Sequence, residues 1–121
     1  MTALVWIGAG ILSGAGAVLR FALQRAVEAR REGAFPLGTL AVNLLGSLLL
    51  GLLHGAGVGG DAALLLGTAL LGSFTTFSTW MVDSERLAAR GETRTATANV
   101  LVSVTLGLAA VALGWAIGAT L

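Results

Sequence analysis

Long apolar stretches separated by short polar connections form the main pattern of this chain. Four stretches are each close to the ~20 residues that a helix needs to cross the hydrocarbon of a bilayer. They lie at about 3–23, 37–54, 62–82 and 98–121. Because the connections between them are short, the pattern predicts an all-α membrane protein with four transmembrane helices in a single domain over residues 1–121.

The composition supports a membrane protein and excludes several other classes. Of 121 residues, 56% are hydrophobic and only 11% are charged, whereas a soluble domain carries about a quarter charged residues. The net charge of +1 rests on seven basic residues, all of them arginines, and does not suggest a nucleic-acid-binding surface. The sequence has no cysteine, no carboxylate pair inside a span and no cluster of metal-ligating side chains, so we do not expect an enzyme.

The arginines are distributed on one side of the predicted bundle. They lie in, or directly beside, the first and third connections: Arg20, Arg25, Arg30, Arg31, Arg86, Arg90 and Arg94. The second connection and the carboxyl end carry no Lys or Arg. Short loops rich in arginine stay in the cytoplasm. We therefore expect a multi-pass protein of the cell membrane in one orientation, with connections 1–2 and 3–4 cytoplasmic and both termini outside.

Polar side chains recur at helical spacing inside two of the spans. In the second span, Thr39, Asn43 and Ser47 are four residues apart and share one helical face. The fourth span repeats this spacing with Thr95, Asn99, Ser103 and Gly107. Such residues either form hydrogen bonds between helices or line a polar pathway. The spacing alone allows both interpretations.

The third span contains an uncharged segment that is rich in hydroxyl groups, GSFTTFSTW at 72–80. Gly72 is the midpoint of the third span, so Gly72 to Thr75 should lie near the bilayer centre. Glycine followed by Ser and Thr is weak helix-forming material. A broken helix at this depth is tolerated where it is buried in protein or lines a polar cavity, and its free carbonyls can hold a small cation. The alternative is an unbroken helix in which the hydroxyls bond to their own backbone.

Two aromatic residues follow in the same segment. Phe77 and Trp80 are three apart and project from one face of the third helix. Such a pair usually faces lipid or the protein core. Ring edges, however, carry partial positive charge, so an anion could meet them without being held by a fixed cation. Conduction requires that combination of easy entry and easy release.

Three motifs carry a resemblance to a known family. GAGAVLR (14–20), PLGTLAVNLLGSLLLG (36–51) and GSFTTFSTW (72–80) resemble the signatures of the CrcB/Fluc fluoride channels, and the likeness extends in order over all four predicted helices. The resemblance implies an antiparallel dimer with a broken third helix in each subunit and two narrow pores. It implies passive export of cytoplasmic fluoride, and a central sodium ion that is structural and is not transported.

The resemblance also implies roles for individual residues. The backbone carbonyls of Gly72 and Thr75 would hold the sodium ion, and Arg20 would close the first helix. The fluoride pore would be lined by Asn43, Phe77, Trp80 and Ser103, with Thr39 and Thr76 beside them. Three positions depart from the family pattern. Trp80 stands in place of a second pore phenylalanine, Asp83 in place of a glutamate near the vestibule, and Gly107 where a hydroxyl is common.

The partner and two alternative functions stay open from the sequence. Because the seven arginines fix one orientation, an antiparallel partner is expected to be a related subunit with the opposite charge bias, in preference to a second copy of this chain. In that assembly this chain could be mainly structural while its partner supplies the working pore. A small multidrug-type exporter has a similar size, but the missing acidic residue in the first span argues against it.

Overall fold

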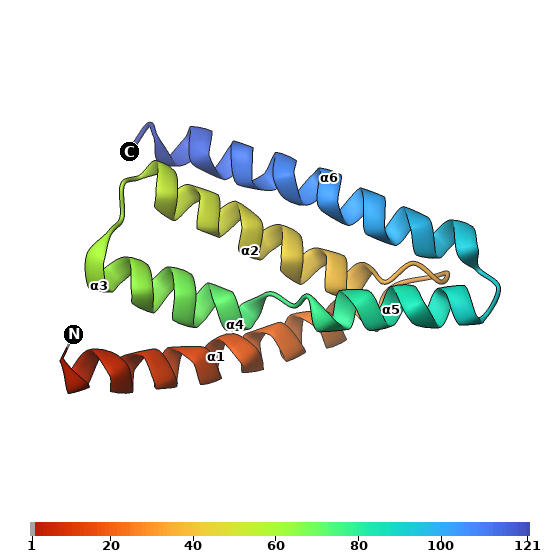
Figure 1. Ribbon diagram of the computed structural model, residues 1–121, viewed down its shortest axis with the longest axis horizontal. Helices are drawn as coiled ribbons and strands as arrows, with labels where there is room; N and C mark the ends of the chain where they lie inside the picture. The colour runs from red at the N-terminus through yellow and green to blue at the C-terminus, as the bar shows by residue number, and fades with distance from the viewer. Residues whose placement is uncertain (1) are drawn as a thin grey trace.

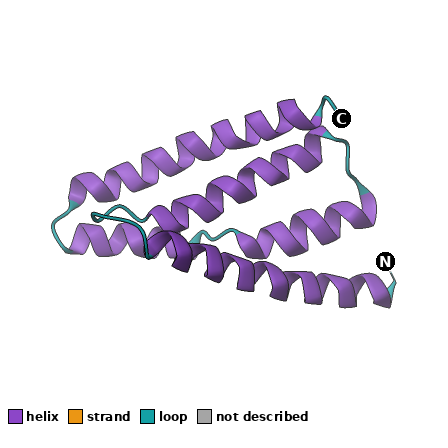
Figure 2. Ribbon diagram, turned by 180° about the vertical axis from the view of Figure 1, so that it is seen from behind, coloured by secondary structure: helices purple, strands orange, loops and turns teal. Residues whose placement is uncertain are grey.

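The structure is a computed structural model that describes residues 2–121, and it is built from helices joined by short connections (Figure 1, Figure 2). The continuous long helices are α1 (Ala3–Glu28), α2 (Leu37–Gly55) and α6 (Thr93–Gly118). The remaining long helix is assembled from α3 (Gly60–Ala62), the π-helical stretch η1 (Ala63–Leu71), α4 (Gly72–Phe74) and α5 (Ser78–Ala89). Within residues 2–121, four helices are long and apolar enough to cross a membrane. The prediction of an all-helical chain with four apolar spans is confirmed.

The helices extend beyond the apolar stretches at the arginine-rich end. The first continues to Glu28, five residues past the expected end at 23, and the fourth begins at Thr93, five residues before 98. The third covers 60–89 in place of 62–82. The apolar pattern marks only the part of each helix that lies in the hydrocarbon of the bilayer, and the helix itself continues beyond it. The flanking turns contain Ala, Arg and Glu, which are strong helix formers in water as well.

Glycines end two of the helices and reverse the chain. Gly57 after α2 and Gly91 after α5 have positive φ angles of 76° and 81°, which glycine adopts without steric cost. At the second of these sites the amide of Glu92 donates to the carbonyl of Leu87 at 2.9 Å, the bond of a Schellman cap. These compact turns, together with the connection after α1, place both arginine-bearing connections at one end of the bundle (Figure 1).

Close backbone contact joins α2 to α6, which lie side by side in both views (Figure 1, Figure 2). Four glycines form this contact: Gly51 and Gly55 on α2, and Gly114 and Gly118 on α6. A Cβ atom added to Gly114 would lie 2.1 Å from the carbonyl oxygen of Leu48, so no larger residue fits there without separating the helices. Small residues permit this approach in membrane helices. The pair Gly114 and Gly118 therefore packs against α2 within the chain.

The third long helix is bent where residues 75–77 leave the helical conformation, with Thr75 extended at φ −85° and ψ 164° (Figure 1). Gly72, at the midpoint of the predicted third span, is still helical at φ −61° and ψ −37°. The helix persists to this point because the amide and the hydroxyl of Thr75 both donate to the carbonyl of Leu71, at 3.1 and 3.2 Å. The interruption therefore begins three residues later than Gly72.

Helix α1 packs against the bent helix at the level of η1 and α4. A Cβ atom on Gly16 would lie 2.1 Å from the hydroxyl of Ser73 and 2.4 Å from the carbonyl of Leu70, so the backbones touch at this level. Ser13 donates to the carbonyl of Ala69 at 3.3 Å. The end of η1 and all of α4 are thus held between α1 and α2, which fixes the place where the chain becomes extended.

Candidate functional site

Asn43 on α2 holds the extended segment through both ends of its amide. Its Nδ2 donates to the carbonyl of Thr76 at 2.9 Å, and its Oδ1 accepts from the amide of Thr76 at 2.8 Å. A backbone that leaves the helix inside a bilayer needs partners of this kind, since lipid offers none. An Asn amide has two N–H donors. One is used in this bond, so the second N–H is available to a group in the adjoining cavity.

The backbone carbonyls of Gly72 and Thr75 are among those that lose their helical donors at the break. In an uninterrupted α-helix, the amide of Thr76 would bond the carbonyl of Gly72, and the amide of Thr79 would bond that of Thr75. The first amide donates instead to Asn43 Oδ1 at 2.8 Å, and the second donates to Thr76 Oγ1 at 3.2 Å. Gly72 and Thr75 are the positions that the resemblance assigns to sodium, and carbonyls of unwound helices are donors that coordinate Na⁺. Their chemistry fits that ion, with two such oxygens per chain.

Thr76 also starts the next helix. Its side chain is buried, with 7% of its surface exposed, and its hydroxyl accepts from the amide of Thr79 and donates to the hydroxyl of Thr79 at 3.0 Å. A threonine oxygen that satisfies a free amide in the first turn is a typical helix cap. The predicted pore residue Thr76 therefore bonds Asn43 through its backbone and Thr79 through its hydroxyl.

The two aromatic residues of the segment lie against each other at a right angle. The ring centroids of Phe77 and Trp80 are 5.6 Å apart with an interplanar angle of 80°. Phe77 is 70% exposed in the single chain. The indole Nε1 of Trp80 donates to the carbonyl of Asn99 on α6 at 3.1 Å. The N–H that distinguishes this residue from a phenylalanine thus binds the backbone of α6 and not the cavity.

Asn99 is the residue that the spacing argument left without a role. It is fully buried, and its Nδ2 donates to Ser84 Oγ at 2.8 Å and to the carbonyl of Trp80 at 3.4 Å. Ser103 lies at the edge of this group, 3.5 Å from Asn99 Oδ1. The network joins α5 to α6. The only sequence signal for it was the four-residue spacing on the fourth span, which identifies a face but not its partner.

Most of the predicted pore residues surround two cavities of about 290 Å³ each. The first is lined by the extended segment and by Gly72, Asn43, Phe77 and Trp80. The second lies between α2 and α6 and brings Asn43 and Trp80 together with Ser103 and Gly107. Asn43 and Trp80 therefore belong to both cavities. At the position of Gly107, where a hydroxyl was expected from the family pattern, the wall has no polar side chain.

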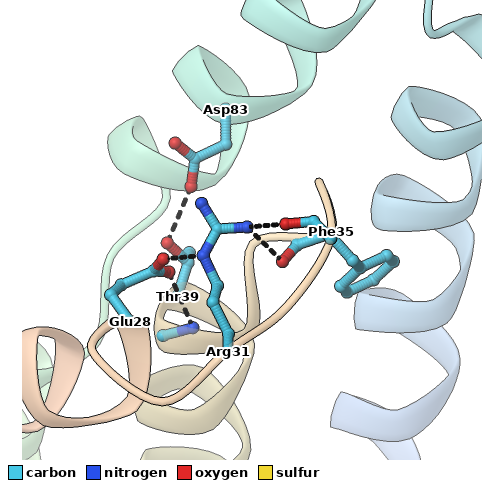
Figure 3. Close-up of polar contacts among 7 residues, drawn as sticks. Glu28, Arg31, Phe35, Thr39 and Asp83 are labelled. Carbon is cyan, nitrogen blue, oxygen red and sulfur yellow. Dashed lines mark hydrogen bonds and ion pairs between the residues drawn. The ribbon is translucent and has the colours of Figure 1, made fainter.

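Thr39 and Asp83 meet at the arginine-rich end, away from these two cavities. The buried hydroxyl of Thr39 donates to Asp83 Oδ2 at 2.7 Å (Figure 3). They share a cavity of about 520 Å³ with the charged residues Arg25, Glu28 and Arg31. The structure therefore groups Asp83 with the charged mouth of the bundle and not with the uncharged middle.

Glu28 and Arg31 organise that mouth (Figure 3). They form an ion pair, and Arg31 also donates to the carbonyls of Gly33 and Phe35 at 2.8 and 2.9 Å. Glu28 accepts from the amide of Gly38 at 3.0 Å, in the first turn of α2. A carboxylate suits that place, because the free amides and the dipole of a helix N-terminus favour negative charge. The first connection is thereby fastened over the start of α2.

Arg20 stands apart from the other predicted site residues. It is half-buried on α1 and is not among the residues that line the three cavities described above.

Comparison with known proteins gives a consistent result. The family model described as CrcB-like protein, Camphor Resistance (CrcB), matches residues 7–115. The chain is 50% identical to "Fluoride-specific ion channel FluC 2" of Mycolicibacterium paratuberculosis over 113 residues, which cover 93% of each protein. It is 49% identical to the protein of that name in Mycobacterium bovis, over 94% of this chain and 90% of the relative. "Fluoride-specific ion channel FluC 1" of Symbiobacterium thermophilum is 45% identical, over 93% and 96%.

Proposed function

The chain belongs to the CrcB-like family, and we propose on that premise that it is a fluoride-specific ion channel that lets cytoplasmic fluoride leave the cell passively. The observation that carries the proposal is the uncharged pathway around Asn43. Two cavities there share a free amide N–H, a hydroxyl and aromatic ring edges. Neutral donors replace part of the hydration of a small anion without trapping it.

We assign the steps along this pathway as follows. The cavity that contains Arg25 and Arg31 forms the polar cytoplasmic mouth, where Glu28 and Asp83 offset the two positive charges, so the mouth admits a hydrated anion without a strong trap. The free N–H of Asn43 and the edge of the Phe77 ring then contact the anion in the first cavity. Ser103 offers its hydroxyl in the second cavity. Trp80 contributes its ring edge alone, because its N–H already donates to Asn99.

We propose that two subunits associate in antiparallel orientation through the face that bears Gly72, Thr75 and Phe77. Gly72 and Thr75 supply two carbonyl oxygens per chain, fewer than a sodium ion coordinates, so a sodium ion there would need oxygens from a second subunit. The ion would neutralise the carbonyl dipoles that meet at the interface. The exposed ring of Phe77 and the open first cavity support a partner on this face.

The orientation in the cell membrane follows from the charges. With all seven arginines at one end, the first and third connections are assigned to the cytoplasm and both termini to the outside. A partner in the opposite orientation is then better supplied by a related subunit of reversed charge bias than by a second copy. This assignment keeps the whole of residues 1–121 as one channel domain.

Efflux from liposomes tests the function. Vesicles containing the chain, alone and with a co-expressed related subunit, are loaded with potassium fluoride and treated with a potassium ionophore. We expect rapid fluoride release at an electrode without any proton gradient, and no chloride release. Release that depends on a proton gradient would favour an exporter. Release only with the partner would make this chain the structural subunit, and release equal to that of empty vesicles in both preparations would refute the proposal.

Topology is tested separately, and the absence of native cysteine makes single reporters possible. Asp61→Cys and Glu32→Cys place thiols at exposed sites on opposite ends of the bundle. In intact cells, a membrane-impermeant maleimide should label Asp61→Cys and leave Glu32→Cys unlabelled. Equal labelling of both would show dual orientation, which would allow an antiparallel homodimer and remove the need for a related partner.

A further inference from the structure

An apolar groove lies on the outside of the bundle, between α1, α2 and the end of the η1–α4 segment. Its volume is about 290 Å³, and every residue that lines it is leucine or phenylalanine. Leu19 and Leu23 form one wall and Leu45 and Leu49 the other, with Phe74 at the base. Leu19 is 55% exposed and Leu45 is 40% exposed, although both are wall residues. The groove is therefore open to the surroundings and presents only hydrocarbon.

On α2 the groove lies opposite the anion pathway, and Leu71 is the one residue that lines both the groove and the first cavity. Leu45 and Leu49 each follow a pathway residue, Asn43 and Ser47, by two positions on α2. Two positions on an α-helix correspond to a rotation of about 200°. A subunit that covers the pathway face therefore leaves the groove open, and at this depth the bilayer supplies its occupant.

A cation lies on the same helical face at the cytoplasmic end. Arg30 follows Leu23 by seven residues and Leu19 by eleven, close to two and three full turns. The turn continues that far, because Ala29 keeps helical angles of −65° and −20° and the amide of Arg30 donates to the carbonyl of Val27 at 3.0 Å. Arg30 thus stands roughly 10 Å above Leu23 along the axis.

Arg30 also differs from its neighbours in what it contacts. Arg31 is occupied by Glu28 and two backbone carbonyls, and the guanidinium of Arg25 lies 5.4 Å from the centre of the Phe21 ring. Arg30 is exposed, and among residues 2–121 its side chain makes no hydrogen bond or ion pair. It is the arginine of the first connection that is free to bind an external anion.

We propose that this groove is a binding site for an anionic phospholipid of the cytoplasmic leaflet. One acyl chain lies between the leucines of α1 and α2, and the lipid phosphate pairs with Arg30. Anionic lipids are concentrated in that leaflet and attract basic residues close to it. The site requires membrane placement with this end in the cytoplasm, and it does not depend on whether the chain conducts fluoride.

Lipid binding to the purified protein in an uncharged detergent, measured by native mass spectrometry, tests the head-group contact. The probes are dioleoylphosphatidylglycerol and dioleoylphosphatidylcholine at equal concentration. We expect the anionic lipid to bind about five-fold more tightly, the attraction of one arginine. Arg30→Gln should remove that preference. The matched controls Arg86→Gln and Arg90→Gln, exposed arginines at the same end, should retain it. Equal loss in all three variants would overturn the site in favour of a diffuse charge effect.

The acyl-chain contact is tested by a phosphatidylglycerol with a photoactivatable group in its chain. We expect crosslinks on the leucines of 19–23 and 45–49, and far fewer after Leu45→Trp, which fills the groove. The control Leu101→Trp changes an exposed leucine of α6 and should leave the crosslinks unchanged. Crosslinks spread evenly around the bundle, displacement of the lipid by water-soluble glycerol phosphate, or disulfide-linked pairs of chains from Leu45→Cys would each refute the proposal. If Leu45→Trp does not fold, the Arg30→Gln comparison decides.

Discussion

The α2–α6 contact and the bend between α4 and α5 both depend on small or polar residues inside the membrane, but with opposite results for the backbone. In the first, glycines bring two uninterrupted helices together. In the second, side chains of Asn43 and Thr76 bind two backbone amides, and the carbonyls of Gly72 and Thr75 lose their helical donors. A rigid pair of helices thus carries the side chain that stabilises an irregular segment beside it.

The difference shows how a channel can hold non-helical backbone at membrane depth. Such a segment is stable only where the protein supplies hydrogen-bond partners. Here the partner is mounted on α2, which is itself fixed against α6 by direct backbone contact. The contact of α2 with α6 therefore holds Asn43 in position to bind the extended segment on another side of α2. Variants that weaken only one of these two regions separate the contributions.

The largest effect is expected from Gly114→Ala. Its new methyl group would lie 2.1 Å from the carbonyl oxygen of Leu48, and a backbone oxygen cannot move aside without displacing α2. Overpacking of this kind costs about 3 kcal/mol. Thermal unfolding in detergent measures the loss. The control Gly14→Ala adds the same methyl group where, among residues 2–121, no other atom lies within 4 Å, and should change stability by less than about 0.5 kcal/mol. Equal losses would contradict the helix contact.

Asn43→Ala should produce the next largest effect, because it leaves the amide and the carbonyl of Thr76 without partners. Two unsatisfied groups at the lower end of about 1–3 kcal/mol each give a loss of roughly 2 kcal/mol in stability, and we expect at least a ten-fold fall in fluoride efflux. The control is Ser47→Ala, which lines both cavities from the next turn of α2 and should keep most of the stability. A variant that unfolds normally yet conducts fluoride at the native rate would remove Asn43 from the pathway.

Trp80→Phe should have the smallest effect. It tests the hydrogen bond that joins the bent helix to α6. It removes one hydrogen bond, from the indole N–H to the carbonyl of Asn99, at a cost of about 1 kcal/mol. The ring edge toward Phe77 is retained, so fluoride efflux should stay within about two-fold of the native rate. Trp80→Leu removes the ring as well and should lower efflux further. If Trp80→Phe abolishes efflux while the protein stays folded, then the indole N–H acts on the anion and not on α6.

Much of this protein follows from local pattern. Apolar length determined four helices, and the arginine distribution places two of the three connections together. The weak helix-forming residues around Gly72 indicated the bend in the third helix within three residues of its actual start at Thr75. These features depend on residues close together in the chain and on the cost of placing polar groups in hydrocarbon. They can therefore be predicted without knowing which distant segments come into contact.

Contacts between distant segments were decided only by the folded chain. The four-residue spacing put Asn99 on a polar face but could not show that it binds Trp80 and Ser84, or that the indole N–H is used there. It likewise could not choose between hydrogen bonds among helices and a lined pathway for Asn43, which combines a bond to Thr76 with a place at two cavities. A helical period gives the direction of a side chain around its own axis. What the side chain meets depends on how closely the neighbouring backbones approach, and that was set by glycines up to 63 residues apart, as in Gly51 and Gly114.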